Sequence, residues 1–234
     1  MSNRPVCIVT GGTSGIGLAT ARAFAAKGYD LAVCARNKER LDKTASELSN
    51  QFDVRVHHAV ADLSVAGNAQ SFVEDSVARL GRLDVLVNNA GLAPNCPVES
   101  FSPENFNDVL SVNVASVFET VRAAWPTMKH AGRGVIVNIS SLAAVDPFPG
   151  FSVYGGTKAF VETFTHAIAN EGKDDGIRAY CVRPGAVDTP LLNSLFPEFP
   201  ADQRVASEDV AALILNLCSD EMRYSSGQAI TIKK

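Results

Sequence analysis

The sequence predicts an α/β fold in which one doubly wound parallel sheet is flanked by helices. Short β-branched segments alternate along the 234-residue chain with longer segments of helical period, which is the order of βαβ units. The predicted strands are apolar on both faces, as a helix-covered sheet requires. Single α/β domains commonly reach about 200–250 residues, and no repeat or linker divides this chain. We therefore expect one domain, residues 1–234.

The individual elements follow from local patterns. Strands are expected at Val6–Thr10, Leu31–Cys34, Val54–Val60, Val85–Asn88, Val135–Ile139, Ile177–Arg183 and Ala229–Ile232. Apolar residues recur every three or four positions in the sets Ile16/Ala19/Ala23, Leu41/Ala45/Leu48/Phe52, Phe72/Ser76/Leu80 and Phe160/Phe164/Ile168, which predicts helices with one buried stripe. A further long helix is expected from Pro103 toward Gly132, because Ser102 is a favoured N-cap and proline is favoured at the first helical position.

Composition argues against several kinds of partner. The net charge of −4 arises without a long run of either sign, which argues against nucleic acid or an anionic membrane. No segment approaches the roughly 18 uninterrupted apolar residues of a membrane span. The five cysteines are odd in number and widely spaced, which is typical of reduced thiols in the cytoplasm. His57 and His58 would point to opposite faces of a strand, so no metal site is predicted.

A glycine-rich segment, Thr10–Gly17, follows the first strand and precedes a helix. Glycines permit a tight turn there and let backbone N–H groups at the helix N-terminus approach a pyrophosphate. The spacing is G-x-x-x-G-x-G, and the alternative is a glycine-rich turn with no ligand. Ligands of such sheets bind outside the carboxyl ends of the strands.

The segment resembles the T-G-x-x-x-G-x-G motif of the short-chain dehydrogenase/reductase family. Asn88-Asn89-Ala90-Gly91 and Pro184-Gly185 are similar to the family's N-N-A-G and P-G turns, and the resemblance covers nearly the whole chain. It implies a Rossmann-type fold and cofactor contacts at Gly11, Thr13, Ser14, Gly15, Ile16, Gly17, Arg36, Asn37, Asp62, Leu63, Asn89, Ala90, Gly91, Tyr154, Lys158, Pro184, Gly185, Val187 and Thr189. For Asn88 and Asp62, stabilisation of a turn is the competing interpretation.

A tyrosine and a lysine four positions apart, Tyr154 and Lys158, fall on one face of a predicted helix. A nearby cation favours the phenolate, although such a pair taken alone is usually a surface pair. By the resemblance, Ser141 stabilises the substrate oxygen and Asn113 holds a relay water, while a purely structural Asn113 is the alternative. Ser140 is expected to bond local backbone instead.

The resemblance implies hydride transfer between a nicotinamide and a carbonyl or alcohol, with Tyr154 as acid and base. We expect NADP(H), with NAD(H) possible, because the acidic residue that selects NAD is absent after the second strand. Arg36 can bind a 2′-phosphate with Asn37 as a second donor; a solvated surface arginine is the alternative. Ser14 occupies a position where many NADP-using relatives have a second basic residue. The other functions considered are a non-catalytic dinucleotide-binding sensor and an epimerase.

The expected substrate is a small carbonyl or alcohol compound of undetermined identity. An apolar pocket rim is expected at Leu92–Pro94, Leu142–Val145, Pro147-Phe148, Leu191-Leu192 and Phe196, with a short lid at about 190–206. The segments Pro103–Lys129 and Tyr154–Gly172 resemble helices that pair in family oligomers, which implies a homodimer or homotetramer. Gly155 and Gly156 are unusual in a helix, and close backbone packing is the expected reason.

Overall fold

Seven parallel strands form one sheet at the centre of the computed structural model, which describes residues 4–234. Residues 1–3 of the predicted domain lie outside the described residues. The strand order is β3-β2-β1-β4-β5-β6-β7, the reversal expected of a doubly wound sheet. The strands are β1 Val6–Thr10, β2 Asp30–Ala35, β3 Val56–Val60, β4 Val85–Asn88, β5 Gly134–Ile139, β6 Ile177–Pro184 and β7 Ala229–Ile232. Their bounds lie within two residues of those predicted, and the predicted fold class is confirmed.

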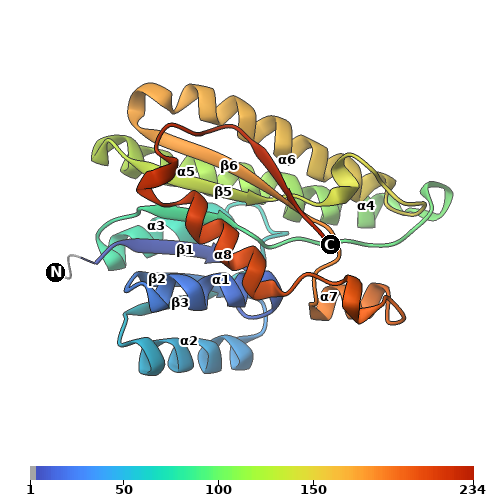
Figure 1. Ribbon diagram of the computed structural model, residues 1–234, viewed down its shortest axis with the longest axis horizontal. Coiled ribbons are helices and arrows are strands. Elements are labelled where there is room, and N and C mark those ends of the chain that lie inside the picture. The colour runs from blue at the N-terminus through green and yellow to red at the C-terminus, as the bar shows by residue number, and fades with distance from the viewer. Residues whose placement is uncertain (1–3) are drawn as a thin grey trace.

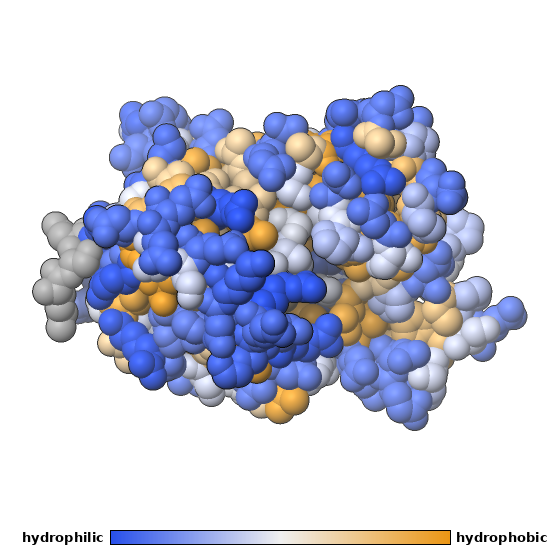
Figure 2. All heavy atoms as spheres, turned by 90° about the horizontal axis from the view of Figure 1, so that it is seen from below, coloured by the Kyte–Doolittle hydropathy of each residue, from blue (hydrophilic) through white to orange (hydrophobic). Residues whose placement is uncertain are grey.

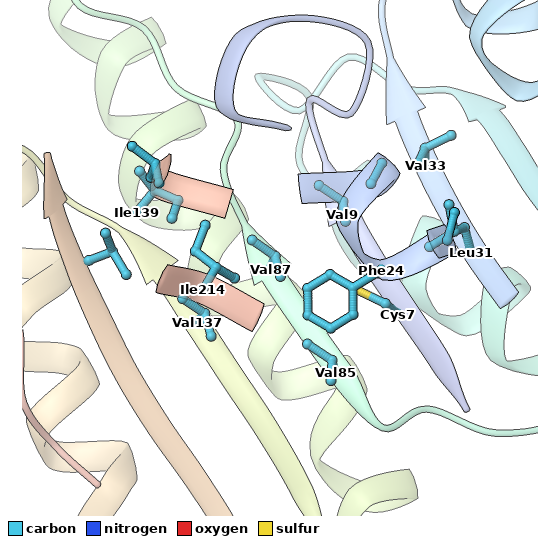
Figure 3. Packing of buried hydrophobic residues seen from close by; sticks show 14 of the residues in the cluster. Cys7, Val9, Phe24, Leu31, Val33, Val85, Val87, Val137, Ile139 and Ile214 are labelled. Atoms are coloured by element: carbon cyan, nitrogen blue, oxygen red, sulfur yellow. The ribbon is translucent and has the colours of Figure 1, made fainter. Parts of the chain in front are cut away.

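Helices cover both faces of this sheet (Figure 1). They are α1 Gly15–Ala26, α2 Lys38–Phe52, α3 Asn68–Leu80, α4 Pro103–Leu110, α5 Ser116–Ala131, α6 Ser152–Glu171, α7 Pro190–Leu195 and α8 Ser207–Leu217. One core forms where α1, α2 and α8 pack on the sheet, and Figure 3 shows strand side chains such as Val85 and Val137 beside Phe24 and Ile214 of the covering helices. The opposite core contains apolar side chains of α3, α5 and α6. Burial of these apolar stripes supplies the main driving force for folding.

The edge strands depart from the predicted pattern. Residues of β3 and β7 are half-buried or exposed, whereas β1, β4 and β5 are buried throughout. A strand at the sheet edge has a neighbour on one side, so helices cover it less completely. His57 contacts Asp75 of α3 and His58 contacts Asp42 of α2, so their side chains point to opposite faces as expected.

The predicted helix from Pro103 toward Gly132 is present but not continuous. Ser102 caps its start by accepting a hydrogen bond from the Asn105 N–H at 3.1 Å, and Gly132 ends it with φ +63°. Between α4 and α5, residues Ser111–Ala115 form one π-helical turn. Such turns are frequent at functional sites, and this one contains Asn113.

Among residues 4–234, no helix is both long enough and apolar enough to cross a membrane. Cys7, Cys34 and Cys181 are buried in strands, as expected for thiols that act as small apolar groups.

Candidate active site

The glycine-rich loop between β1 and α1 is closely packed. The N–H groups of Gly11 and Gly12 donate to the Cys34 carbonyl at the end of β2, at 3.0 and 3.3 Å. Gly15 has φ +50°, and an added Cβ there would lie 2.9 Å from the Thr189 side chain. At Gly17 a Cβ would lie 2.3 Å from the Gly11 carbonyl oxygen. The chain can therefore make this turn only with glycine at these positions.

Asn89, just after β4, holds this loop in place. Its side-chain amide donates to the carbonyl oxygens of Thr10 and Gly11 at 2.9 and 3.2 Å. The Thr10 hydroxyl in turn accepts from the backbone N–H groups of Asn89 and Ala90. The carboxyl ends of β1 and β4 are thus joined at the point where the strand order reverses. This is the place where doubly wound folds bind ligands.

A groove of about 470 Å³ runs over these turns. Fifteen of the predicted cofactor residues line it: Gly11, Thr13, Ser14, Gly15, Ile16, Arg36, Asn37, Asp62, Leu63, Asn89, Ala90, Gly91, Tyr154, Lys158 and Thr189. Pro184, Gly185 and Val187 line the adjoining cavity instead, and Gly17 only packs against the loop. The segment Thr13–Ile16 at the start of α1 lines the groove, and a helix N-terminus of this kind can bind a phosphate through its backbone N–H groups, so the groove fits a dinucleotide.

At the end of β2, two arginines line the groove. Arg36 was predicted from its position, whereas Arg40 was not. Asn37 is the N-cap of α2 and accepts a hydrogen bond from the Arg40 N–H at 2.8 Å, which leaves its amide N–H groups as donors. Arg40 belongs to the first turn of α2. Asparagine is a favoured N-cap residue, so a helix start assigned at Asn37 would have placed Arg40 beside Arg36 at the end of β2. Asp62 bonds Ser64 as the turn interpretation predicted, and it lines the groove as well.

Asn88 does not stabilise a turn, and that alternative is wrong. Its amide donates to the Asn138 carbonyl oxygen at 2.8 Å, and its own oxygen accepts from the Thr120 hydroxyl at 2.7 Å. Asn138 donates onward to Thr165. These buried side chains join β4 and β5 to α5 and α6 behind the site.

A second, mostly apolar cavity of about 620 Å³ adjoins the groove. Its lining includes the predicted rim residues Ala93, Leu142, Ala143, Phe148, Leu191, Leu192 and Phe196, and it includes Leu195, Phe199, Asp202 and Gln203 from the predicted lid segment. Phe151, Lys233 and Lys234 also line it and were not predicted. Of the other predicted rim residues, Leu92 lines the groove instead, and Pro94, Ala144, Val145 and Pro147 do not line the cavity. Figure 2 shows hydrophobic side chains gathered at the right of a largely hydrophilic face, at the place along the long axis where α7 lies in Figure 1.

Tyr154, in the first turn of α6, lies where the groove and the cavity meet and lines both. Lys158 lines the groove alone, and Ser141 lines the cavity alone. Burial raises the pKa of Tyr154 above its ordinary value, and a hydrogen bond with Ser141 opposes that shift. The predicted acid–base group is therefore open to ligands on both sides.

Lys158 is buried, with 5% of its surface exposed, so the interpretation of a surface pair is wrong. Its ammonium group donates to the Ile139 carbonyl at 2.8 Å and lies 5.7 Å from the centre of the Tyr154 ring. Desolvation lowers the pKa of Lys158 to about 8. The group remains mostly protonated at neutral pH, close to the phenol.

Asn113 uses both amide hydrogens and one of the two lone pairs of its amide oxygen in structural hydrogen bonds. Its oxygen accepts from the Leu92 N–H at 2.8 Å, and its nitrogen donates to the Leu92 carbonyl and the Thr157 hydroxyl at 2.8 and 3.0 Å. The structural alternative is therefore supported, and one lone pair of the amide oxygen is not used by these three bonds. A Cβ added to Gly91 would lie 3.4 Å from both the Asn113 oxygen and the Lys158 nitrogen, so the two groups face the same point.

Ser140 departs from expectation, because its main hydrogen bond is to a side chain. Its hydroxyl donates to the Glu162 carboxylate at 2.7 Å, and Glu162 also accepts from the Arg183 guanidinium at 2.8 Å. This ion pair connects α6 with the ends of β5 and β6. Ser141, in contrast, lines the cavity and accepts a hydrogen bond from the Ala143 N–H at 3.2 Å.

Close packing explains one of the two glycines in α6. A Cβ on Gly155 would lie 2.5 Å from the Ala143 carbonyl oxygen, so the helix rests on the loop after Ser141. No atom lies within 4 Å of the Cβ position of Gly156, so the packing explanation is wrong there.

Comparison with known proteins agrees with this geometry. The family model described as short chain dehydrogenase matches residues 5–199. The 2-(R)-hydroxypropyl-CoM dehydrogenase of Xanthobacter autotrophicus is 32% identical and is matched over 97% of this chain and 96% of its own length.

Two solved structures share the fold closely. The L-sorbose reductase of Gluconobacter frateurii, solved with NADPH and L-sorbose, has a TM-score of 0.91 at 30% identity and is matched over 98% of this chain and 95% of its own. A 3-ketoacyl-(acyl-carrier-protein) reductase of Brucella melitensis with NADH has a TM-score of 0.89 at 29% identity, over 99% and 98% of the two chains. The chain therefore belongs to the short-chain dehydrogenase/reductase family and is an oxidoreductase that acts on CH–OH and C=O groups with a nicotinamide cofactor.

Proposed function

We propose that this protein is an NADP(H)-dependent carbonyl reductase, or the corresponding alcohol dehydrogenase, in which Tyr154 is the acid and base. The observation that carries the proposal is the position of Tyr154 at the junction of the groove over the glycine-rich loop and an apolar cavity. A substrate carbonyl in the cavity would meet the phenol directly. A non-catalytic sensor is not favoured, because the relatives are named dehydrogenases and reductases.

Each side chain around Tyr154 has a separate role in the proposed reaction. A bound nicotinamide supplies or accepts the hydride. Tyr154 donates a proton to the substrate oxygen during reduction and accepts it during oxidation. Ser141 donates a hydrogen bond to that oxygen as negative charge develops. Lys158 favours the phenolate by its charge and bonds the nicotinamide ribose, and Asn113 holds a relay water beside it.

The proposed preference for NADP(H) rests on Arg36, with Arg40 as a second cation beside it. A guanidinium can bind a phosphate through two parallel hydrogen bonds, whereas an acidic side chain at the end of β2 would repel it. Asp62, the one acidic side chain among the described residues that line the groove, bonds Ser64 and lies after β3. NAD(H) is the alternative cofactor. Of the nineteen predicted cofactor positions, we propose eighteen as contacts and assign Gly17 to the packing of the loop.

The remaining features of the proposal concern assembly and setting. We propose one catalytic domain with a short lid over about 190–206, which contains α7 and part of the cavity wall. Exposed Phe118 and Phe160, on α5 and α6, support a homodimer or homotetramer formed through these helices. The free cysteines support a reducing, cytoplasmic setting.

The test is stoichiometric oxidation of NADPH by a panel of ketones and aldehydes, with NADH in parallel and the matching alcohols in reverse. We expect product in equal amount to oxidised cofactor and a higher kcat/KM with NADPH. Cofactor binding without turnover of any carbonyl or alcohol would refute the proposal.

A further inference from the structure

Arg204 is a mostly buried arginine near the end of the proposed lid, and the proposed reaction gives it no role. Its side chain is 13% exposed and lines neither the groove nor the cavity. The lid helix α7 lies apart from the helices that cover the sheet (Figure 1). A guanidinium with so little contact with water must find partners for its N–H groups within the protein, so those partners show what it holds.

Arg204 bonds three separate parts of the chain around the lid. Its Nη1 donates to the Asp188 carboxylate at 3.1 Å and to the Asn193 side-chain oxygen at 2.6 Å. Its Nε and Nη2 both donate to the Phe199 carbonyl oxygen, at 3.1 and 2.5 Å. A planar fork of donors can hold several acceptors at once, whereas a lysine ammonium group is a single point. One side chain therefore joins the residues before the lid, α7 and the segment after α7.

The partners of Arg204 belong to the wall of the apolar cavity or adjoin it. Phe199 lines the cavity itself. Asp188 and Asn193 do not line it, but residues close to them in the sequence do. These lining residues are Val187, Thr189, Leu192 and Leu195. Arg204 thus lies outside the wall and fixes the backbone that carries it.

The two ends of the lid are tied to each other. The Asp188 N–H donates to the Val205 carbonyl at 2.9 Å, and the Val205 N–H donates to the Ala186 carbonyl at 2.8 Å. The lid is therefore a loop with a closed base, and its own shape decides where its apolar side chains lie. The four hydrogen bonds of Arg204 cross this loop, so they set that shape.

The lid meets the proposed acid–base group through an aromatic contact. The Phe196 ring stacks on Phe151 at 5.9 Å between centroids, and Phe151 contacts the Tyr154 ring edge-on at 5.6 Å. Both phenylalanines line the cavity. An aromatic or other bulky apolar group attached to the reacting carbonyl would pack against these rings. The position of Phe196 depends on the lid, and so does this packing.

We propose that Arg204 is a positioning residue, which keeps the lid folded as one wall of the cavity before substrate binds, and that this wall selects carbonyl compounds with a bulky apolar group. A wall that is already in place costs less to order when the substrate binds. The inference rests on the proposed function, since Tyr154 fixes the position of the reacting oxygen. It adds a substrate class and a residue outside the cavity that determines it.

The experiment compares butanone with benzylacetone, two methyl ketones that differ by one phenyl ring. Arg204→Met removes the donors and keeps an apolar stem. Asn193→Ala removes one of the four bonds at an exposed position and keeps the test open if Arg204→Met folds poorly. The matched control, Arg178→Met, removes an arginine that donates to backbone carbonyls at the end of α8 and lines neither the groove nor the cavity.

The readouts are kcat and KM with NADPH and hydrogen–deuterium exchange of residues 190–203 without cofactor. In Arg204→Met we expect the KM for benzylacetone to rise about tenfold, while its kcat and both constants for butanone stay close to wild type. Lid exchange should become about tenfold faster without a change elsewhere. Asn193→Ala should shift both readouts less in the same direction, and the control should shift neither. A loss of folded protein would instead lower kcat for both ketones alike.

An unchanged ratio of the two KM values, or lid exchange at the wild-type rate, in both lid variants would overturn the inference and leave the proposed function intact. A wild type with the higher kcat/KM for butanone would also overturn it. If no ketone or alcohol is turned over, the proposed function fails, and calorimetric binding of benzylacetone to the NADP⁺-loaded proteins decides the inference separately. Weaker binding to Arg204→Met supports it, and equal binding, or binding to neither protein, overturns it.

Discussion

Replacing Lys158 by methionine should stabilise the cofactor-free protein near neutral pH while removing the proposed catalytic cation. The ammonium group is buried, and its one recorded hydrogen bond is to the Ile139 carbonyl. Methionine has a similar length and no charge, so it fills the same space. The expected result is a variant that is more stable and nearly inactive.

The magnitude follows from the pKa of Lys158, which burial lowers from its ordinary value of 10.5 to about 8. At about 1.4 kcal/mol per pKa unit, charging this group costs the folded state about 3 kcal/mol more than the unfolded state. In the variant the Ile139 carbonyl loses its hydrogen-bond donor, which destabilises the protein by about 1–2 kcal/mol and offsets part of this effect. The net stabilisation of the variant at pH 7 should be about 1–2 kcal/mol.

The pH dependence has a definite sign. Below pH 8 Lys158 is charged in both the folded and the unfolded state, so the buried charge destabilises the folded wild type by its full amount. Between about 8 and 10.5 the unfolded chain binds more protons than the folded protein, so wild-type stability rises relative to that of the variant. Guanidinium unfolding of both proteins from pH 6.5 to 10 measures this, with Lys27→Met as the exposed control. A variant that is less stable at pH 7, with a pH profile parallel to wild type, would refute the reasoning.

Three further outcomes follow from the geometry. Ser141→Ala should lower kcat by about 10²-fold or more, whereas Ser140→Ala should mainly lower the stability of the protein. Steady-state kinetics of both variants measure this, and a larger loss of kcat in Ser140→Ala would contradict the assignment of Ser141. Arg36→Ala should lower the ratio of kcat/KM for NADPH over NADH, and an unchanged ratio would remove the basis for the proposed preference. Gly155→Ala should destabilise the protein by about 1–3 kcal/mol, whereas Gly156→Ala should stabilise it by up to about 1 kcal/mol; thermal unfolding that ranks them in the opposite order would contradict the packing.

The strands and the edge that carries the site could be predicted because their signals are local. Thr10–Gly17 combines a strand end, a glycine-rich turn and a helix start within eight residues, so the local pattern favours a phosphate-binding loop over a turn without a ligand only once the family resemblance is added. Ser141 was assigned through the resemblance to the family, and Tyr154 and Lys158 through their spacing of four together with that resemblance. Tyr154 lines both the groove and the cavity, between Lys158 in the groove and Ser141 in the cavity.

Features that depend on tertiary contacts were not predictable. The π turn at Asn113 interrupts a regular helical pattern, and the side chain there bonds Leu92 and Thr157, which lie far away in the sequence. The partner of Ser140 is Glu162, on a helix that only the fold brings close. Lys233 lines the cavity because β7 ends beside the β6 turn, a contact that no local pattern reports.

The most direct test of the central claim is turnover by Tyr154→Phe, since this change deletes only the hydroxyl at the junction of groove and cavity. We predict a variant that folds and binds NADPH with unchanged affinity, measured by fluorescence titration, while kcat for carbonyl reduction falls by about 10²–10⁴-fold. Retention of more than about a tenth of wild-type kcat, with cofactor affinity intact, would contradict the assignment of Tyr154 as the acid and base.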